Sequence, residues 1–243
     1  MLEGLFSAAA GMSAQQLQLD AVSNDLANVS TSGYKSERVG FEDLLYNPVH
    51  KAGTETTAGA GAAARIIGRN QTQGPLKETG NPLDLAIQGE GFFQLRRPGG
   101  GTALTRDGAF QVNADGSIGD AAGNLLEPPI KLPTGVSASE VRIGADGTVT
   151  AQGKRLGRIA LATVTAPGAL SPEGGGMLAP NAASGAPHPL TGGHITQGAL
   201  EESNVDLGRD MSTMMTAERA FQMSSTAIQT ESQMMAIANQ LRS

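Results

Sequence analysis

The chain reads LFSAAAGMSAQQLQLDAVSNDLANV over residues 5–29, and this stretch decides the fold. Its large apolar residues recur every seven positions, at Leu5, Met12, Leu19 and Leu26. A seven-residue apolar repeat keeps one narrow stripe of side chains facing a partner helix. The sequence therefore predicts a long amphipathic helix from about Leu5 to Val29.

The other end of the chain carries the same pattern. Over residues 207–241 the stripe consists of Leu207, Met214, Phe221, Ile228 and Met235, flanked by Ala220, Ala227, Met234 and Leu241. Asn204 and Asp206 are both suited to cap this second helix. Six of the nine methionines lie in it. They either fill a core or let one surface pack against several different neighbours, because the thioether side chain is unbranched and adaptable.

The residues between the helices have the alternating pattern and turn residues that are typical of β-strands. From about residue 73 to 197, short alternating runs are separated by the turn signals Asp107-Gly108, Asp115-Gly116 and Asp146-Gly147. Residues 167–198 are expected to form loops. We predict an α+β fold in which paired terminal helices (residues 1–35 and 200–243) form a coiled coil. An extended connector or hairpin (36–74) joins them to a β-rich outer domain (75–199).

The composition excludes several classes of function. The 243 residues carry a net charge of -6, no cysteine, no tryptophan and 3% aromatic residues. Nucleic-acid binding favours a basic surface with stacking side chains, so it is not expected. Disulfides and cysteine ligands are ruled out. We expect neither a cleavable secretion signal nor a membrane-inserted segment, which needs about 18 apolar residues in a row.

No residues form a recognisable reactive site. His188 and His194 lie six residues apart in a segment rich in proline and glycine, and neither they nor His50 have companion ligands for zinc. The glycines near Glu90 precede a strand rather than a helix, which argues against a phosphate loop. The three Asp-Gly aspartates are explained by turn formation. We therefore predict no catalytic residue, no cofactor and no metal site.

Four sequence blocks resemble the bacterial flagellar rod and hook protein family. They are LANVSTSGYK (26–35), IQGEGFFQ (87–94), TRDGAF (105–110) and GALEESNVD (198–206), in the family's order and across nearly the whole chain. Matched to the family's signatures, the motif residues are Ala27, Asn28, Thr31, Gly33, Tyr34, Lys35, Ser203, Asn204 and Val205. Residues 41–46 (FEDLLY) resemble the distal rod branch, whereas the tail ANQL (238–241) is more like the proximal rod branch. We predict a subunit of the distal rod, with the proximal rod as the alternative.

The resemblance implies a structural subunit rather than an enzyme. Members of this family stack into a hollow helical tube that transmits torque from the motor to the hook. The implied partners are further copies of the chain, other rod proteins, the hook protein and the flagellar type III export apparatus. The implied location is the flagellar basal body outside the cytoplasm, in the periplasm where an outer membrane exists. The apolar stripes of both helices are the predicted assembly interface.

Two other classes remain open from the residues alone. A non-flagellar tube or adhesin subunit would share the glycine-rich β texture, but it would not need matched heptads at both ends. A hydrolase would need a clustered histidine or carboxylate pair, which a structure reveals directly.

Overall fold

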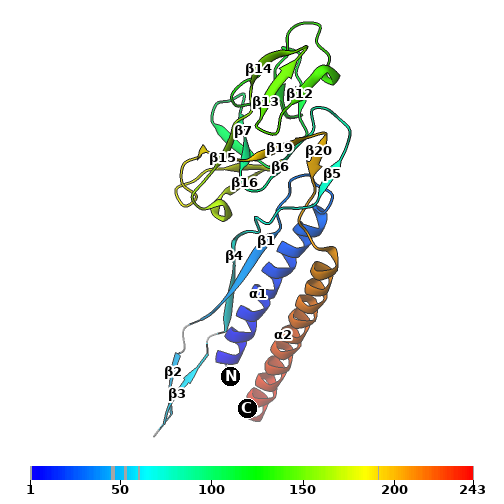
Figure 1. Ribbon diagram of the computed structural model, residues 1–243. Coiled ribbons are helices and arrows are strands. Elements are labelled where there is room, and N and C mark those ends of the chain that lie inside the picture. The colour runs from blue at the N-terminus through cyan, green and yellow to red at the C-terminus, as the bar shows by residue number, and fades with distance from the viewer. Residues whose placement is uncertain (1, 45–46, 52–53, 60, 191, 243) are drawn as a thin grey trace. The chain divides into compact units, whose positions relative to one another are not determined.

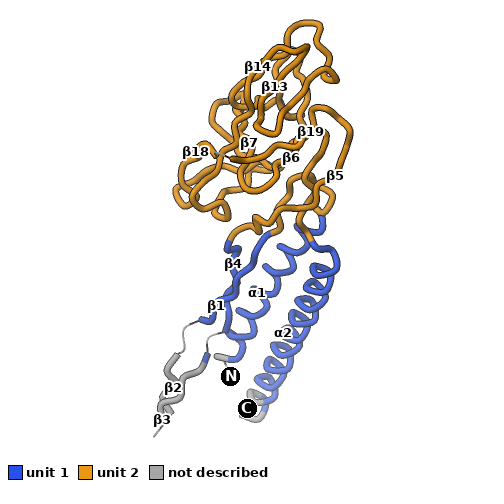
Figure 2. The backbone as a smooth tube through the Cα atoms, viewed as in Figure 1, with its two compact units in different colours: residues 1–27, 37–67, 206–243 blue, residues 28–36, 68–205 orange. Residues whose placement is uncertain are grey.

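The structure is a computed structural model of the 243-residue chain, and it describes residues 2–44, 47–51, 54–59, 61–190 and 192–242. The chain forms two compact units (Figure 2). The helical unit comprises residues 1–27, 37–67 and 206–243, and the β unit comprises residues 28–36 and 68–205. The predicted α+β class is confirmed, because a helix lies at each end of the chain and the middle is rich in strands (Figure 1).

The helical unit is built on α1 (Leu2–Ala27) and α2 (Leu207–Arg242), which pack side by side (Figure 1). The two helices are antiparallel, because Gly4 lies opposite Glu231 and Gly11 lies opposite Ser224. A Cβ atom added at Gly4 would meet the Glu231 carboxylate at 2.9 Å, so glycine permits this approach. The seven residues from Gly4 to Gly11 on α1 are thus matched by the seven from Ser224 to Glu231 on α2.

The start of α2 is set by Asp206. Its carboxylate accepts the backbone N–H of Arg209 at 3.2 Å, which satisfies a donor that the first helical turn leaves free. Of the two capping residues that the sequence allows, Asp206 takes this role and Asn204 is bound elsewhere in the β unit.

Four strands occupy the segment between α1 and the β unit. β1 (Glu37–Asp43) pairs with β4 (Ala62–Arg69), and β2 (Asn47–Lys51) pairs with β3 (Thr54–Ala58) in an antiparallel hairpin. The Asp25 carboxylate of α1 accepts the backbone N–H of Glu37 at 3.0 Å. The beginning of β1 is therefore tied to the last turns of α1.

The β unit consists of short antiparallel strands. They are β5 (Leu76–Glu78), β6 (Leu85–Gln88), β7 (Phe92–Arg96), β8 (Thr102–Thr105), β9 (Gln111–Val112), β10 (Ile118–Gly119), β11 (Leu125–Leu126), β12 (Val141–Ile143), β13 (Thr148–Ala151), β14 (Lys154–Arg158), β15 (Leu161–Thr163), β16 (Ser171–Gly174), β17 (Met177–Ala179), β18 (His188–Pro189), β19 (His194–Gln197) and β20 (Ala199–Glu201). The β unit also contains two short 3-10 helices, η1 (Ala138–Glu140) and η2 (Pro167–Ala169).

The largest sheet of the β unit runs in the order β16-β17-β8-β7-β11-β10-β9, and β15 pairs with both β7 and β18. The smaller sheets are β12-β13-β14, β19-β6 and β20-β5. Residues 167–198, for which the sequence predicts loops, contain β16 to β19. That prediction is wrong because β17, β18 and β19 pair with strands that are not their neighbours in sequence, and β16 forms a hairpin with β17. For example, residues 194–197 pair with residues 85–88, which no local pattern reveals.

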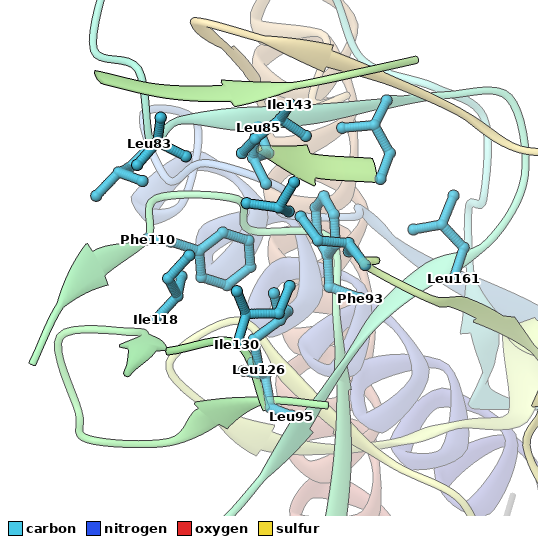
Figure 3. Packing of buried hydrophobic residues seen from close by; sticks show 14 of the residues in the cluster. Leu83, Leu85, Phe93, Leu95, Phe110, Ile118, Leu126, Ile130, Ile143 and Leu161 are labelled. Carbon is cyan, nitrogen blue, oxygen red and sulfur yellow. The ribbon is translucent and has the colours of Figure 1, made fainter. Parts of the chain in front are cut away.

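The core of the β unit is formed by inward residues of several strands (Figure 3). The rings of Phe93 and Phe110 meet edge to face, with centroids 5.1 Å apart. Gly108 is required beside them, because a Cβ atom there would lie 1.7 Å from the carbonyl oxygen of Leu85. A second cluster lies around Phe92, the neighbour of Phe93 on the opposite face of β7.

Replacing Phe93 by Ala should lower the free energy of unfolding of the β unit by about 3–5 kcal/mol, because a side chain with 0% exposure leaves a cavity. Hydrogen exchange of the amides in β6 to β8 measures this quantity. The matched control is Val112→Ala, whose side chain is 37% exposed and whose loss should change stability by less than about 1 kcal/mol. Equal effects of the two substitutions would contradict the assigned core.

Candidate functional site

The predicted stripe of α1 lies at the border of the helix pair. Leu5, Met12, Leu19 and Leu26 are all half-buried. They stand one residue beyond the line of Gly4 and Gly11, which faces α2. Because consecutive helical residues are about 100° apart, the stripe flanks the contact instead of forming its centre. The fully buried positions of α1 carry mostly small residues, namely Ala14, Ala21 and Val22.

The predicted stripe of α2 lies mainly on the side of α1. Met214, Phe221, Ile228 and Met235 are half-buried, and Ala217, Ser224 and Glu231 alternate with them at spacings of three and four. Leu207, the first residue of α2, is instead half exposed. The sequence also predicts Ala227 and Met234 beside this stripe, but both are exposed. Within the single chain the seam toward α1 continues through Ser224 and Glu231, and a place for Ala227 and Met234 in the assembly interface stays a prediction. The side chain of Leu241 lies outside the described part of the chain.

A separate apolar surface is exposed on the helical unit. On α2 it comprises Met211, Met215, Met223, Met234 and Ile237, which we call the outer face. Phe6 of α1 is 72% exposed, and Phe41, Leu44, Ile66 and Ile67 are exposed in and beside β1 and β4. Exposed apolar surface on this scale marks an interaction site. A seven-residue repeat describes only one stripe of a helix, so it does not predict the outer face. The high methionine content of α2 is the sequence feature that indicates this surface.

The family motif residues lead to a buried ion-pair cluster of Lys35, Arg106 and Glu201. The Lys35 Nζ donates to Glu201 Oε1 at 2.5 Å, and an Arg106 Nη donates to Glu201 Oε2 at 3.1 Å. The Glu201 side chain is 0% exposed and that of Lys35 is 2% exposed. Remaining bonds run to the backbone: Lys35 Nζ donates to the Thr72 carbonyl, and a second Arg106 Nη donates to the Gly89 carbonyl.

Burial dominates the electrostatics of this cluster. Removal from water lowers the pKa of Lys35, and the hydrogen bond to Glu201 opposes that shift. Burial likewise lowers the pKa of Arg106, again opposed by Glu201. One carboxylate thus serves two cations, and it also accepts the backbone N–H of Gly74 at 3.0 Å. The fold depends on Glu201, because without it two buried cations would face each other.

Asn204 joins the same chain segments a few residues further on. Its side-chain oxygen accepts the backbone N–H of Ser36 at 2.8 Å, and its Nδ2 donates to the carbonyls of Asn70 and Thr72. The backbone N–H of Asn204 also donates to the carbonyl of Tyr34 at 3.3 Å. Within the β unit, the segment that follows α1 is thus bonded to the segment that precedes α2.

The remaining motif residues shape these two segments. Gly33 has a φ of +67°, and a Cβ atom there would lie 2.5 Å from the backbone nitrogen of Asp107. Its own N–H donates to the Glu201 carbonyl at 2.8 Å. The buried Tyr34 ring carries the Arg69 guanidinium at 5.5 Å from its centroid, a cation–π contact.

Polar motif residues make local hydrogen bonds. Thr31 Oγ1 donates to Asn28 Oδ1 at 3.2 Å, and Ser203 Oγ accepts the N–H of Val205 at 3.3 Å. Ala27, the last residue of α1, is exposed. Arg106 and Glu201 are absent from the predicted site, although both stand in the quoted blocks. Arg106 and Glu201 lie 71 and 166 residues from Lys35 in sequence, so only the fold reveals the cluster.

The three turn aspartates are not an acid–base pair. Each carboxylate accepts the backbone N–H two residues ahead: Asp107 from Ala109, Asp115 from Ser117 and Asp146 from Thr148. The interpretation as turn residues is confirmed. Hydrogen bonds from Ser117 and Thr148 lower the pKa values of Asp115 and Asp146, whereas burial raises the pKa of Asp107.

His188 and His194 stand exposed in β18 and β19, and the side chain of His50 lies outside the described residues. Across residues 2–44, 47–51, 54–59, 61–190 and 192–242, no three His, Asp or Glu side chains gather as metal ligands would. Within those same ranges, neither helix has the long apolar stretch that crossing a membrane requires.

Comparison with known families finds three matches along the chain. Residues 5–35 match the flagella basal body rod protein family, and residues 86–151 match the flagellar hook protein FlgE/F/G D1 domain. Residues 196–241 match the flagellar basal body rod FlgEFG protein C-terminal family. All four sequence blocks lie within these matches, and IQGEGFFQ and TRDGAF share the D1 match.

Individual relatives extend the similarity over the whole chain. The flagellar basal-body rod protein FlgG of Caulobacter vibrioides is 36% identical over 264 residues, covering 100% of both chains. FlgG of Borreliella burgdorferi is 34% identical over 263 residues, covering 100% of this chain and 99% of its own. The flagellar basal-body rod protein FlgF of Caulobacter vibrioides is 32% identical over 211 residues, covering 84% of this chain and 83% of its own.

Replacing Glu201 by Gln should lower the free energy of unfolding of the β unit by about 3–5 kcal/mol, because two buried cations lose their carboxylate. Lys35→Met should cost less, since the pair of Glu201 and Arg106 remains. Urea unfolding of the two variants measures the difference. The control is the neighbour Glu202→Gln, which breaks an exposed pair with Lys77 and should cost at most about 1 kcal/mol. An E201Q variant as stable as E202Q would refute the role of the cluster.

Replacing Asp107 by Asn should raise stability at pH 7. The folded-state pKa of Asp107 lies above its ordinary 3.8, so its ionised form is disfavoured in the folded protein. This cost grows as pH rises through that pKa and vanishes below 3.8. Asp115→Asn is the control of opposite sign, because its pKa is lowered and its stabilisation is lost as pH falls. Unfolding curves recorded between pH 3 and pH 7 test both signs.

Proposed function

The chain belongs to the flagellar basal-body rod protein family and is a structural subunit of the distal rod, and we propose that it polymerises into a hollow helical tube carrying torque from motor to hook. The observation that carries the tube model is the apolar surface left exposed on the helical unit. An exposed apolar face of this kind is stabilised when another subunit packs against it. A contact that joins unlike faces of identical subunits and does not close into a ring produces an open helical polymer.

We propose that α1 and α2 pair as a coiled coil in the assembled rod. Three features support this: the antiparallel packing, the matched seven-residue register of Gly4 with Glu231 and Gly11 with Ser224, and the three–four spacing of half-buried residues on α2. The stripes of Leu5 to Leu26 and of Leu207 to Met235 border this pair. Their exposed edges, together with the outer face of α2, are the proposed contacts with neighbouring subunits.

The buried ion-pair cluster joins, within the β unit, the two chain segments that continue into the terminal helices. Lys35 follows α1 in the chain and Glu201 precedes α2, and both are fixed in the β unit with Arg106. The division into a helical layer (residues 1–35 and 200–243), a connector (36–74) and an outer domain (75–199) is our proposal for the assembled rod.

The assignment to the distal rod branch rests on how much of this chain each relative matches. The FlgG relatives match this chain from end to end, whereas the FlgF relative matches 84% of it. This favours the distal rod over the proximal rod, the alternative that the tail at residues 238–241 suggests. Membership of the rod family removes the non-flagellar tube and adhesin alternatives. The relatives are structural rod proteins, which supports a role without catalysis.

We propose the partners that this position in the flagellum requires. Copies of the chain bind one another, other rod proteins join one end of the tube and the hook protein joins the other. The flagellar type III apparatus exports the subunit, so the rod lies outside the cytoplasm, in the periplasm of cells with an outer membrane. No cofactor, metal ion, nucleic acid or membrane insertion has a role in this proposal.

Met223→Glu should abolish polymerisation while leaving the helix pair intact, because residue 223 is 74% exposed on the outer face. A carboxylate buried there between subunits would cost several kcal/mol. Phe221→Asp, on the inner seam, should abolish polymerisation and also reduce helix content. Sedimentation and circular dichroism of the purified chain measure the two properties, and motility of cells tests them in place. Glu218→Gln, an exposed change on the same helix, is the control. Normal motility with M223E present in basal bodies would refute burial of the outer face.

A further inference from the structure

The methionines of α2 fall into two sets. Met214 and Met235 are half-buried on the seam toward α1, whereas Met211, Met215, Met223 and Met234 are exposed, each by more than half of its surface. Because the chain has no cysteine, methionine supplies all of its sulfur chemistry. The exposed thioethers are therefore the groups most open to an electrophilic oxidant.

The exposed set lies away from the intramolecular contact. The residues of α2 that face α1 include Ser224 and Glu231, opposite Gly11 and Gly4. Neither residue is a methionine, and the small side chains that allow the close approach would be unaffected by oxidation. Of the five outer-face residues, four are methionines and the fifth is Ile237. Nearly all the apolar character of this surface therefore depends on sulfur.

We propose that Met211, Met215, Met223 and Met234 form an oxidation site that controls assembly. Hydrogen peroxide is the oxidant class. A lone pair of the thioether sulfur attacks one peroxide oxygen, the S–O bond forms and the O–O bond breaks. The leaving hydroxide takes the proton of the hydroxyl group now bound to sulfur and becomes water, so the sulfur loses two electrons and the peroxide gains them. The product is methionine sulfoxide, which is polar and which sulfoxide reductases convert back to methionine.

This inference rests on the proposed self-assembly of the chain. A free subunit exposes the four thioethers, and a sulfoxide among them places a strong dipole on a surface that a neighbour must cover. An assembled subunit buries the same sulfurs and is protected. Oxidation therefore blocks the addition of free subunits but spares the rod already built, and the helix pair of the oxidised subunit stays folded.

The experiment compares the full-length wild type with the variant M211L/M215L/M223L/M234L. Leucine keeps the surface apolar but has no sulfur. Each purified protein is treated with hydrogen peroxide, the modified residues are located by peptide mass spectrometry, and polymerisation is followed by sedimentation over a range of concentrations. Circular dichroism checks that the helices survive.

For the wild type we expect the four exposed methionines to oxidise before Met12, Met214 and Met235. The concentration needed for assembly should then rise about tenfold or more, the change that about 1.4 kcal/mol produces. For the leucine variant, the concentration needed for assembly is compared before and after treatment of the same protein, and peroxide should leave it unchanged. Unchanged assembly of oxidised wild type, or equal inhibition of the leucine variant, would overturn the inference and leave the proposed function intact. Failure of untreated wild type to assemble at any concentration would overturn both.

Discussion

Glu201 lies between Lys35 and Arg106 in the interior of the β unit, and most of the sequence's recognisable features serve this arrangement. A buried carboxylate is costly unless cations and N–H groups surround it, and here two cations and the Gly74 amide do so. Lys35, Arg106 and Glu201 come from the first, third and fourth of the blocks shared with rod proteins, and the Gly89 carbonyl of the second block accepts a hydrogen bond from Arg106. Their resemblance to a family therefore has a physical basis in one cluster.

In the helical unit, small side chains and large apolar side chains occupy different surfaces. Gly4, Gly11, Ala14 and Ala21 allow α1 to pack closely within its own subunit, so the intramolecular pair uses little large apolar surface. The larger residues, above all the methionines of α2, remain on the outside. Such a subunit is folded internally but leaves large apolar side chains exposed, which suits a protein that is surrounded by other copies of itself after assembly. The exposed methionines of α2 are also accessible to oxidants that do not reach buried side chains.

Polar groups that resemble catalytic residues have structural roles here. The Asp-Gly aspartates bond the backbone of their own turns, and Arg106 and Glu201 bond each other. Asn204 is the clearest case. It stands next to a helix start and is chemically suited to cap it, yet it bonds Ser36, Asn70 and Thr72 instead. Asp206 then caps α2, so the two functions are separated by two residues.

The sequence by itself determined the helices at both ends, the turns at Asp-Gly pairs and the family, because these depend on local periodicity and local backbone chemistry. It did not determine β16 to β19, which contain two to four residues each and exist through pairing with strands up to about a hundred residues away. Nor did it identify the cluster of Lys35, Arg106 and Glu201, or the part that Ser224 and Glu231 take in the seam of α2. Only the tertiary structure decided these features, since a buried charge is stable only where the folded chain brings its partners together.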